Sequence, residues 1–169
     1  MLTLKWFFVL ILFLAILAIL AGQLGMFKGI APNDLGVVEG RLKLPADTPN
    51  SVSSQADFYP DHPQHGYARI EPLPLVGDSK SVLDKIKSII EVIPGSKVVI
   101  YQEHYLYVQF TTRVMKFVDD AEFWFDPQSN VVQVRSASRL GKSDLGVNRK
   151  RIEWIRGQLK SVRPLTQVA

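Results

Sequence analysis

One apolar run near the N-terminus constrains this chain more than any other feature. The residues from Trp6 to Ala21 are all apolar, and Gln23 is the only strongly polar residue between that run and Lys28. A bilayer core about 30 Å thick needs roughly 20 helical residues that each rise about 1.5 Å. The 22 residues 6–27 are therefore long enough to cross a membrane as one helix.

Residues 1–27 have two interpretations, an uncleaved membrane anchor or a removed signal segment, and the sequence favours the anchor. A signal peptide usually has an apolar core of roughly 7–15 residues before a cleavage site made of small residues. The best cleavage site here, Ile19-Leu20-Ala21, has isoleucine where a small residue is needed. The chain has no cysteine, which excludes lipoprotein processing after the run.

The charges beside the run do not fix its orientation, because Lys5 precedes it and Lys28, Arg41 and Lys43 follow it. A short N-terminal anchor before a long domain is nevertheless the usual signal-anchor arrangement, and long domains translocate largely regardless of charge. We therefore expect a single-pass protein of a bacterial cytoplasmic membrane. Its soluble domain is expected on the extracytoplasmic, periplasmic side.

The rest of the chain, roughly 140 residues, is long enough for one hydrophobic core. Residues 28–64 contain five prolines and three glycines, which predicts an irregular lead-in to the folded domain. Residues 65–169 have the periodic apolar patterns of a folded core. The sequence therefore predicts three parts, 1–27, 28–64 and 65–169.

Periodicity predicts the elements of that core. Apolar residues at helical spacing predict one helix that Asp78 or Ser79 caps and that runs to about Ile93, and a second helix over residues 147–162. Alternating, β-branched and aromatic runs predict strands over 67–75, 97–102, 105–112, 115–125 and 131–136. The predicted fold is α+β, an antiparallel sheet of about five strands packed against two helices, preceded by one N-terminal transmembrane helix.

The segment from Arg135 to Arg163 is strongly basic, with nine basic and two acidic residues in a chain of net charge +4. Such a surface suits anionic lipid headgroups, a polyanionic envelope polymer or an acidic partner. The other interpretation is a solvated helix face with i, i+4 pairs such as Arg149–Glu153. Nucleic acid is not an expected partner, because no recognition motif accompanies the charge.

Residues 135–149 form the strongest candidate for a binding site. Arg135 and Arg139 leave a predicted strand with hydroxyl side chains between them, and such arginines can grip a carboxylate or phosphate. Asn148 could cap the next helix, and Asp144 could orient one arginine. The predicted ligand-binding residues are Arg135, Ser138, Arg139, Asp144, Asn148 and Arg149, with Asn50, Ser53 and Ser54 packed nearby.

An alternative interpretation of these charges is structural. Asp119, Asp120 and Glu122 lie on the preceding predicted strand, so they and the arginines could neutralise one another in a half-buried ion network. In a third interpretation, Asp120 and Glu122 point to the same side of that strand and perform acid–base catalysis.

Several motifs resemble a known family, the bacterial and plastid domain of unknown function 1499 (DUF1499). Asn33-Asp34-Leu35-Gly36 and Pro49-Asn50-Ser51-Val52-Ser53-Ser54-Gln55 resemble its opening signature, and Asp119-Asp120-Ala121-Glu122 and residues 135–149 resemble its closing signatures. The resemblance covers roughly residues 33–160 in the expected order. Members commonly have cysteine where this chain has Ser51, which excludes a thiol-dependent role here. The resemblance implies a fold and site positions but no reaction.

The residues give other chemistries less support. Asp61-His62-Pro63-Gln64-His65 contains two imidazoles and a carboxylate without a third strong ligand, so no metal is expected. Serines 51, 53 and 54 with His65 lack the Gly-x-Ser-x-Gly elbow of many hydrolases. No cofactor is expected, because phosphate- and dinucleotide-binding glycine motifs are absent from the sequence.

Taken together, these patterns predict a membrane-anchored domain that binds an anionic small molecule, lipid or partner without transforming it. An alternative is an envelope- or lipid-directed hydrolase or transferase that uses Asp120 and Glu122. A further alternative is an accessory subunit of a membrane complex, whose basic C-terminal helix meets an acidic neighbour.

Overall fold

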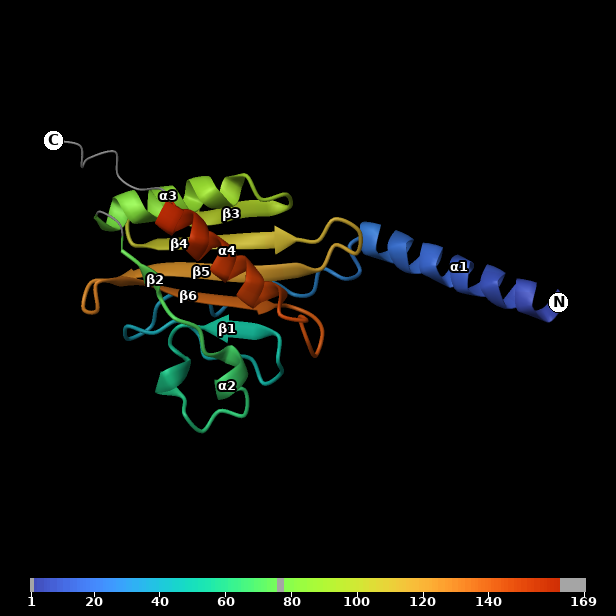
Figure 1. The fold of residues 1–169 in the computed structure, drawn as a ribbon, viewed down its shortest axis with the longest axis horizontal. Coiled ribbons are helices and arrows are strands. Elements are labelled where there is room, and N and C mark those ends of the chain that lie inside the picture. Colours follow the sequence, from blue (N-terminus) through green and yellow to red (C-terminus); the bar gives the residue numbers. More distant parts are fainter. Residues whose placement is uncertain (1, 76–77, 162–169) are drawn as a thin grey trace.

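The computed structural model describes residues 2–75 and 78–161, and it shows a long helix projecting from an α+β domain (Figure 1). Helix α1 (Leu2–Gln23) contains a 20-residue apolar stretch, Leu4–Gln23, which projects from the domain and is buried against it only at Gly22 among the residues whose burial is described. Its length and composition allow it to cross a membrane, and a signal sequence would share both properties. The predicted N-terminal apolar helix is confirmed.

The domain is built on one antiparallel sheet. Its strands are β1 (Ser51–Ser53), β2 (Leu73–Pro74), β3 (Ser96–Tyr101), β4 (Tyr105–Thr111), β5 (Val118–Asp126) and β6 (Val131–Ser138). They lie in the order β1-β6-β5-β4-β3, and β2 pairs with the other end of the β6 edge that β1 occupies. The four predicted strands after residue 96 are confirmed, each with bounds within three residues.

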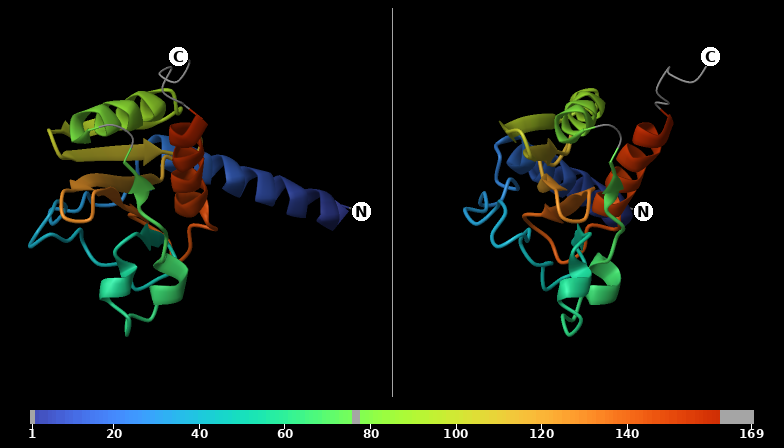
Figure 2. Two further views of the ribbon diagram at one scale, coloured as in Figure 1. Left: turned by 60° about the vertical axis from the view of Figure 1, so that its left-hand side comes forward. Right: turned by 90° about the vertical axis from the view of Figure 1, so that its left-hand side faces the viewer.

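Helices α3 (Ser79–Glu91) and α4 (Val147–Ser161) cover one face of this sheet (Figure 2). Asp78 caps α3 by accepting a hydrogen bond from the Ser81 backbone N–H at 2.8 Å, as the sequence predicts for this start. The apolar stripes of both helices pack on the inward side chains of β4, β5 and β6 in one core. The last predicted helical residue, Val162, lies outside the described residues.

The predicted strand over residues 67–75 is wrong for most of its length. Residues His65–Ala68 form a short helix, α2, and only Leu73–Pro74 pair with β6. Pro72 and Pro74 have no backbone N–H to donate, which limits the pairing that this segment can make. A single 3-10 turn, η1 (Ala56–Phe58), and α2 also raise the number of helices above the prediction.

The proline-rich segment after α1 lies over the sheet face that α3 and α4 leave open (Figure 2). Residues 28–50 form no helix or strand beyond an isolated bridge between Val38 and Arg41, and they are packed: Leu42 is buried, and its backbone N–H donates to Gln55 Oε1 at 2.8 Å. Strand β1 follows this segment, and Val52 of β1 belongs to the core. The three-residue β1 is too short to show an alternating pattern, so the sequence does not predict it.

Candidate functional site

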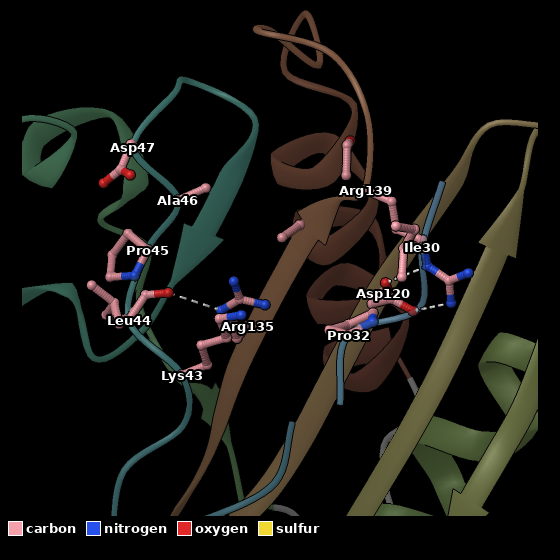
Figure 3. A pocket seen from close by; sticks show the side chains of 12 residues that line it. Ile30, Pro32, Lys43, Leu44, Pro45, Ala46, Asp47, Asp120, Arg135 and Arg139 are labelled. Atoms are coloured by element: carbon pink, nitrogen blue, oxygen red, sulfur yellow. Dashed lines mark hydrogen bonds and ion pairs between the residues drawn. The ribbon is translucent and has the colours of Figure 1, made fainter. Parts of the chain in front are cut away.

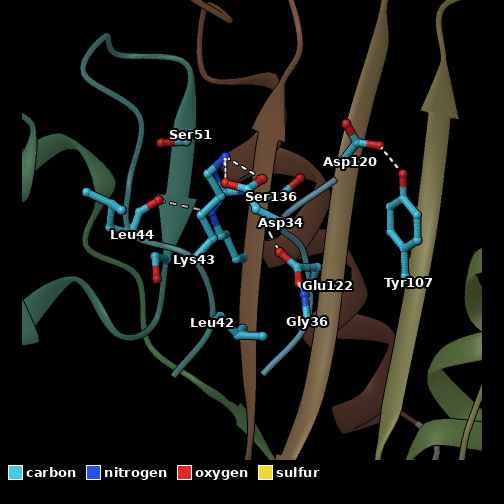
Figure 4. Close-up of polar contacts among 12 residues, drawn as sticks. Asp34, Gly36, Leu42, Lys43, Leu44, Ser51, Tyr107, Asp120, Glu122 and Ser136 are labelled. Carbon is cyan, nitrogen blue, oxygen red and sulfur yellow. Dashed lines mark hydrogen bonds and ion pairs between the residues drawn. The ribbon is translucent and has the colours of Figure 1, made fainter. Parts of the chain in front are cut away.

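The two faces of the sheet separate the residues that the sequence places in one cluster. Successive side chains of a strand point to opposite faces. Asp120 and Glu122 point toward the irregular segment 28–50 (Figure 4), and so does Arg135, which donates to Leu44. Asp119 and Ser138 point toward α4. The predicted binding residues therefore form two clusters with different surroundings.

The helix-side cluster joins α4 to the sheet. Asn148 is fully buried, and its Nδ2 donates to the Asn50 carbonyl and to Ser138 Oγ, both at 3.1 Å. Ser138 Oγ donates to Asp119 Oδ1 at 2.5 Å, and Arg151 Nη2 donates to Asp119 Oδ2 at 2.7 Å. Because these groups satisfy one another, this cluster has the character of a structural network.

Asp144, and not Asn148, caps helix α4. Asp144 accepts hydrogen bonds from the Asn148 and Gly146 backbone N–H groups at 2.9 and 3.0 Å, and from the Tyr67 hydroxyl. Burial raises the pKa of Asp144, but these bonds outweigh it and hold the pKa below its ordinary value. Within the described chain Asp144 has no ion pair with an arginine, so it does not orient one as predicted. Arg149 instead donates to the Tyr67 carbonyl.

Asn50, Ser53 and Ser54 stabilise the β1 edge of the sheet. Asn50 Nδ2 donates to the Gly141 carbonyl at 2.7 Å, and Ser53 Oγ accepts from the Gln55 backbone N–H at 3.1 Å. Ser54 Oγ donates to Gln133 Oε1 at 2.7 Å. These are turn and edge contacts.

On the opposite face, Asp120 and Arg139 form a closed ion pair (Figure 3). Arg139 Nε and Nη2 donate to the two Asp120 oxygens at 2.7 and 2.8 Å, a bidentate arrangement. The Tyr107 hydroxyl donates to Asp120 Oδ1 at 2.5 Å. Hydrogen bonding to Asp120 raises the pKa of Arg139. Both carboxylate oxygens of Asp120 are therefore occupied.

Glu122, two residues along β5, is fully buried and only half satisfied. Its Oε1 accepts hydrogen bonds from the Gly36 backbone N–H at 2.7 Å and the Tyr105 hydroxyl at 2.8 Å (Figure 4). Its Oε2 has no hydrogen-bond partner, and the nearest cation is Arg135 Nη1 at 3.8 Å. Burial raises the pKa of Glu122 above its ordinary value, although both hydrogen bonds and Arg135 oppose the rise.

Arg135, on the same face of the sheet, has few hydrogen bonds for a buried charged side chain. Its side chain is buried, and its Nε donates to the Leu44 carbonyl at 3.2 Å (Figure 3). The structure gives its two terminal nitrogens no hydrogen bond to any described residue, and the Glu122 contact is too long for one. Burial lowers the pKa of Arg135, against the effect of Glu122. The side chain is therefore largely buried, and its terminal N–H groups make no hydrogen bond within the described residues.

Arg135 lines a cavity of about 390 Å³ between β6 and the irregular segment, which we call the Arg135 cavity (Figure 3). Lys43 lines it from the irregular segment and forms a 2.7 Å ion pair with Asp34. Its lining consists of Ile30, Pro32, Lys43, Leu44, Pro45, Ala46, Asp47, Asp120, Arg135, Ala137, Ser138 and Arg139. Of the predicted binding residues, only Arg135, Ser138 and Arg139 are among them.

The sequence does not predict the wall formed by residues 43–47. No local pattern links this stretch to β6, because 91 positions separate Leu44 from the arginine that its carbonyl accepts from. The nearby lysine and prolines are ordinary features of an irregular segment. Only the chain path over the open sheet face brings them to the arginines.

Most arginines of α4 form ion pairs or hydrogen bonds with other residues of the chain. Arg151 pairs with Asp119, and Arg156 pairs with Glu153 at 2.9 Å and donates to the Glu71 and Pro72 carbonyls. Lys150 and Lys160 are exposed. The basic segment therefore presents less free charge than its composition indicates.

The two histidines of the 61–65 segment contact different carboxylates. His65 Nε2 lies 2.8 Å from Asp57 Oδ1, and His62 Nε2 lies 3.5 Å from Asp47 Oδ1. Residues 2–75 and 78–161 contain no group of three histidine, aspartate or glutamate side chains placed to hold a metal ion. His65 pairs with a carboxylate in place of a serine hydroxyl.

The buried Glu122 predicts a pH dependence of stability. Since its pKa is raised above 4.5 in the folded chain, the protonated form favours folding, and this contribution is lost as the pH rises from about 4.5 through the raised pKa. Across this pH range the free energy of unfolding of the wild type should fall relative to that of Glu122→Gln. The fall should be about 1.4 kcal/mol for each unit by which folding raises the pKa of Glu122. Urea unfolding of both proteins across this pH range measures the difference, and a pH-independent difference would contradict the prediction.

Comparison with known proteins gives a family match and no functional precedent. A family model described as a protein of unknown function (DUF1499) matches residues 41–159, which include the whole sheet, α3 and most of α4. No curated protein matches the chain. The match confirms the resemblance seen in the sequence motifs.

Proposed function

The chain belongs to the DUF1499 family of proteins of unknown function, and we propose that it is a membrane-tethered module that binds an anionic group in the Arg135 cavity. In this proposal α1 spans a bacterial cytoplasmic membrane, and the domain lies on its periplasmic side. Binding, without chemical transformation, is the activity that the geometry supports best.

The observation that carries the proposal is the incomplete coordination of Arg135. A guanidinium has five N–H donors, and within residues 2–75 and 78–161 this one makes a single hydrogen bond, to Leu44, while its side chain is buried. Burying a charge without enough partners is unfavourable. An anion with two or more oxygens, such as a phosphate or carboxylate, would supply acceptors in the geometry that arginine prefers.

The size and the second cation of the cavity also suit a small anionic group. A volume of about 390 Å³ lies within the usual range of small-molecule sites, roughly 300–1,000 Å³. Lys43 reaches the same cavity from the opposite wall, and its present partner, Asp34, is well exposed to solvent. An incoming anion can therefore compete for the Lys43 ammonium at low cost.

The acid–base alternative has less support from the same geometry. Both oxygens of Asp120 are occupied by Arg139 and Tyr107. Glu122 has a raised pKa, which suits a general acid, but it is fully buried and does not line the cavity. A substrate in the cavity would have Arg135 between itself and Glu122.

Titration of the full-length protein in detergent micelles with inorganic phosphate tests the proposal. We expect calorimetry to detect binding, and Lys43→Gln to weaken it by up to about fivefold, because a partly exposed ion pair contributes up to about 1 kcal/mol. Lys80→Gln, which removes an exposed lysine of α3 away from the cavity, should leave the affinity unchanged.

Three results would count against anion binding in this cavity: no binding of phosphate to the wild type, equal effects of the two lysine variants, or no effect of either. Native mass spectrometry of the detergent-extracted protein before and after a salt wash gives an independent measurement. A small bound mass supports the module, whereas release of a protein by salt favours an accessory subunit.

A further inference from the structure

We propose that two loops at the α1 end of the sheet lie against the membrane that α1 spans and insert apolar side chains into its headgroup region. These membrane-facing loops are residues 112–117, between β4 and β5, and residues 139–146, between β6 and α4. The inference rests on the anchoring part of the proposed function and is independent of anion binding in the Arg135 cavity.

The end of α1 is fixed to the first of these loops. Gln23, the last residue of α1, donates through Nε2 to the Val114 carbonyl at 2.7 Å, and Phe27 stacks on Phe117 with 5.4 Å between ring centroids. Gly22 packs so closely on Met115 that an added Cβ would lie 2.8 Å from the Met115 carbonyl oxygen. The loop therefore lies where the apolar helix ends (Figure 1).

Both loops expose large apolar side chains toward this end of the molecule. Leu145 is 84% exposed, and Val114 and Leu140 are 50% and 40% exposed. Leu145 also has a φ of +52°, a left-handed conformation that is uncommon for a residue other than glycine, asparagine or aspartate. A leucine that is both strained and exposed is unfavourable in water, and insertion into lipid accounts for its presence.

An apolar hollow of about 220 Å³ connects the two loops on the α4 side of the sheet. Phe117 contributes to it from the first loop, and Leu140 and Leu145 contribute from the second. Leu140 and Leu145 thus share one apolar surface with Phe117 of the first loop, and scattered single side chains would not form such a hollow.

Most of the exposed charges around this apolar surface are basic; Asp119 and Asp144 also line the hollow, but Asp119 is paired with Arg151, and Asp144 accepts hydrogen bonds from Tyr67 and two backbone N–H groups. Arg113 and Lys116 lie in the first loop, Lys142 lies in the second, and Lys28 follows α1. Among the described residues, none of these four has an ion pair. Basic side chains around an apolar patch are typical of surfaces that bind bilayers with anionic lipids. The partner that fits is therefore the bilayer surface beside α1.

This placement of the loops also puts the Arg135 cavity near the membrane surface. Ile30 and Pro32 line the cavity, and they follow α1 by only a few residues. With the loops on the membrane surface, the cavity opens close to the lipid headgroups. An anionic group presented at that level can reach Arg135 without leaving the membrane surface.

Single fluorescent labels on the full-length protein test the loop placement. The chain has no cysteine, so Leu145→Cys and Gln128→Cys each provide one thiol for an environment-sensitive dye. Gln128 is exposed in the turn between β5 and β6, at the opposite end of the sheet, and serves as the matched control. Both labelled proteins are reconstituted into phosphatidylcholine nanodiscs with and without phosphatidylglycerol.

We expect nitroxide-labelled lipid to quench the dye at position 145 several-fold more than the dye at position 128, and aqueous iodide to show the reverse order. Phosphatidylglycerol should strengthen the contrast. Equal quenching at the two positions in reconstituted protein would overturn the loop placement and leave anion binding untouched. Failure of the protein to enter nanodiscs would instead overturn the anchoring on which both proposals depend.

Discussion

Replacing Arg139 with alanine is expected to lower the free energy of unfolding by about 3–5 kcal/mol, the usual cost of breaking a buried ion pair from one side. The substitution leaves the Asp120 carboxylate, only 2% exposed, without the two charge-assisted bonds that now balance its desolvation. Tyr107 remains as a partner, but one hydroxyl does not neutralise a carboxylate. Urea unfolding of the purified protein measures this loss.

Two further variants separate the buried pair from arginine replacement in general. Arg69 pairs with Asp57 at 3.0 Å on the exposed surface, where solvent screens the charges, so Arg69→Ala should cost much less stability than Arg139→Ala. The double variant Asp120→Asn with Arg139→Gln removes both charges and should recover part of the stability lost in Arg139→Ala. If Arg139→Ala costs no more than Arg69→Ala, Asp120 and Arg139 do not act as a buried structural pair.

The sequence predicts the central sheet well because its strands are long and their side chains alternate strongly. Over β5, the buried apolar residues Ala121 and Phe123 alternate with Asp120 and Glu122, so both the strand and its two faces follow from a period of two. The segment 67–75 shows only a weak alternation interrupted by prolines, and local hydrogen bonds turn its first residues into α2. Weak periodicity was therefore a poor guide there.

The candidate site is less predictable than the sheet. Alternation along β6 separates Arg135 from Ser136 and Ser138, so the division into two clusters was contained in the sequence. The sequence does not show which of the two arginines has fewer hydrogen-bond partners, because those partners come from distant strands and loops. Arg139 pairs with Asp120 of β5, whereas the polar contacts of Arg135 among the described residues are the Leu44 carbonyl and a carboxylate oxygen of Glu122 at 3.8 Å.

Replacing Arg135 with glutamine is expected to weaken phosphate binding by about 30-fold or more, which corresponds to about 2 kcal/mol or more. Glutamine keeps an N–H donor near Leu44 but removes the charge and the paired terminal nitrogens that face the cavity. Phosphate titration of the full-length protein measures the change. Arg149→Gln is the matched control, because Arg149 belongs to the predicted cluster but donates to Tyr67 away from the cavity.

The pH dependence of stability shows whether Arg135→Gln has removed the intended charge. Arg135 lowers the pKa of Glu122, so its loss should raise that pKa further. The stability deficit of Arg135→Gln relative to the wild type should therefore be small at acidic pH and grow as the pH rises. A folded variant that shows this trend and still binds phosphate with wild-type affinity would exclude Arg135 as the anion ligand. Loss of binding in Arg149→Gln alone would place the anion at the N-terminal end of α4 and not in the Arg135 cavity.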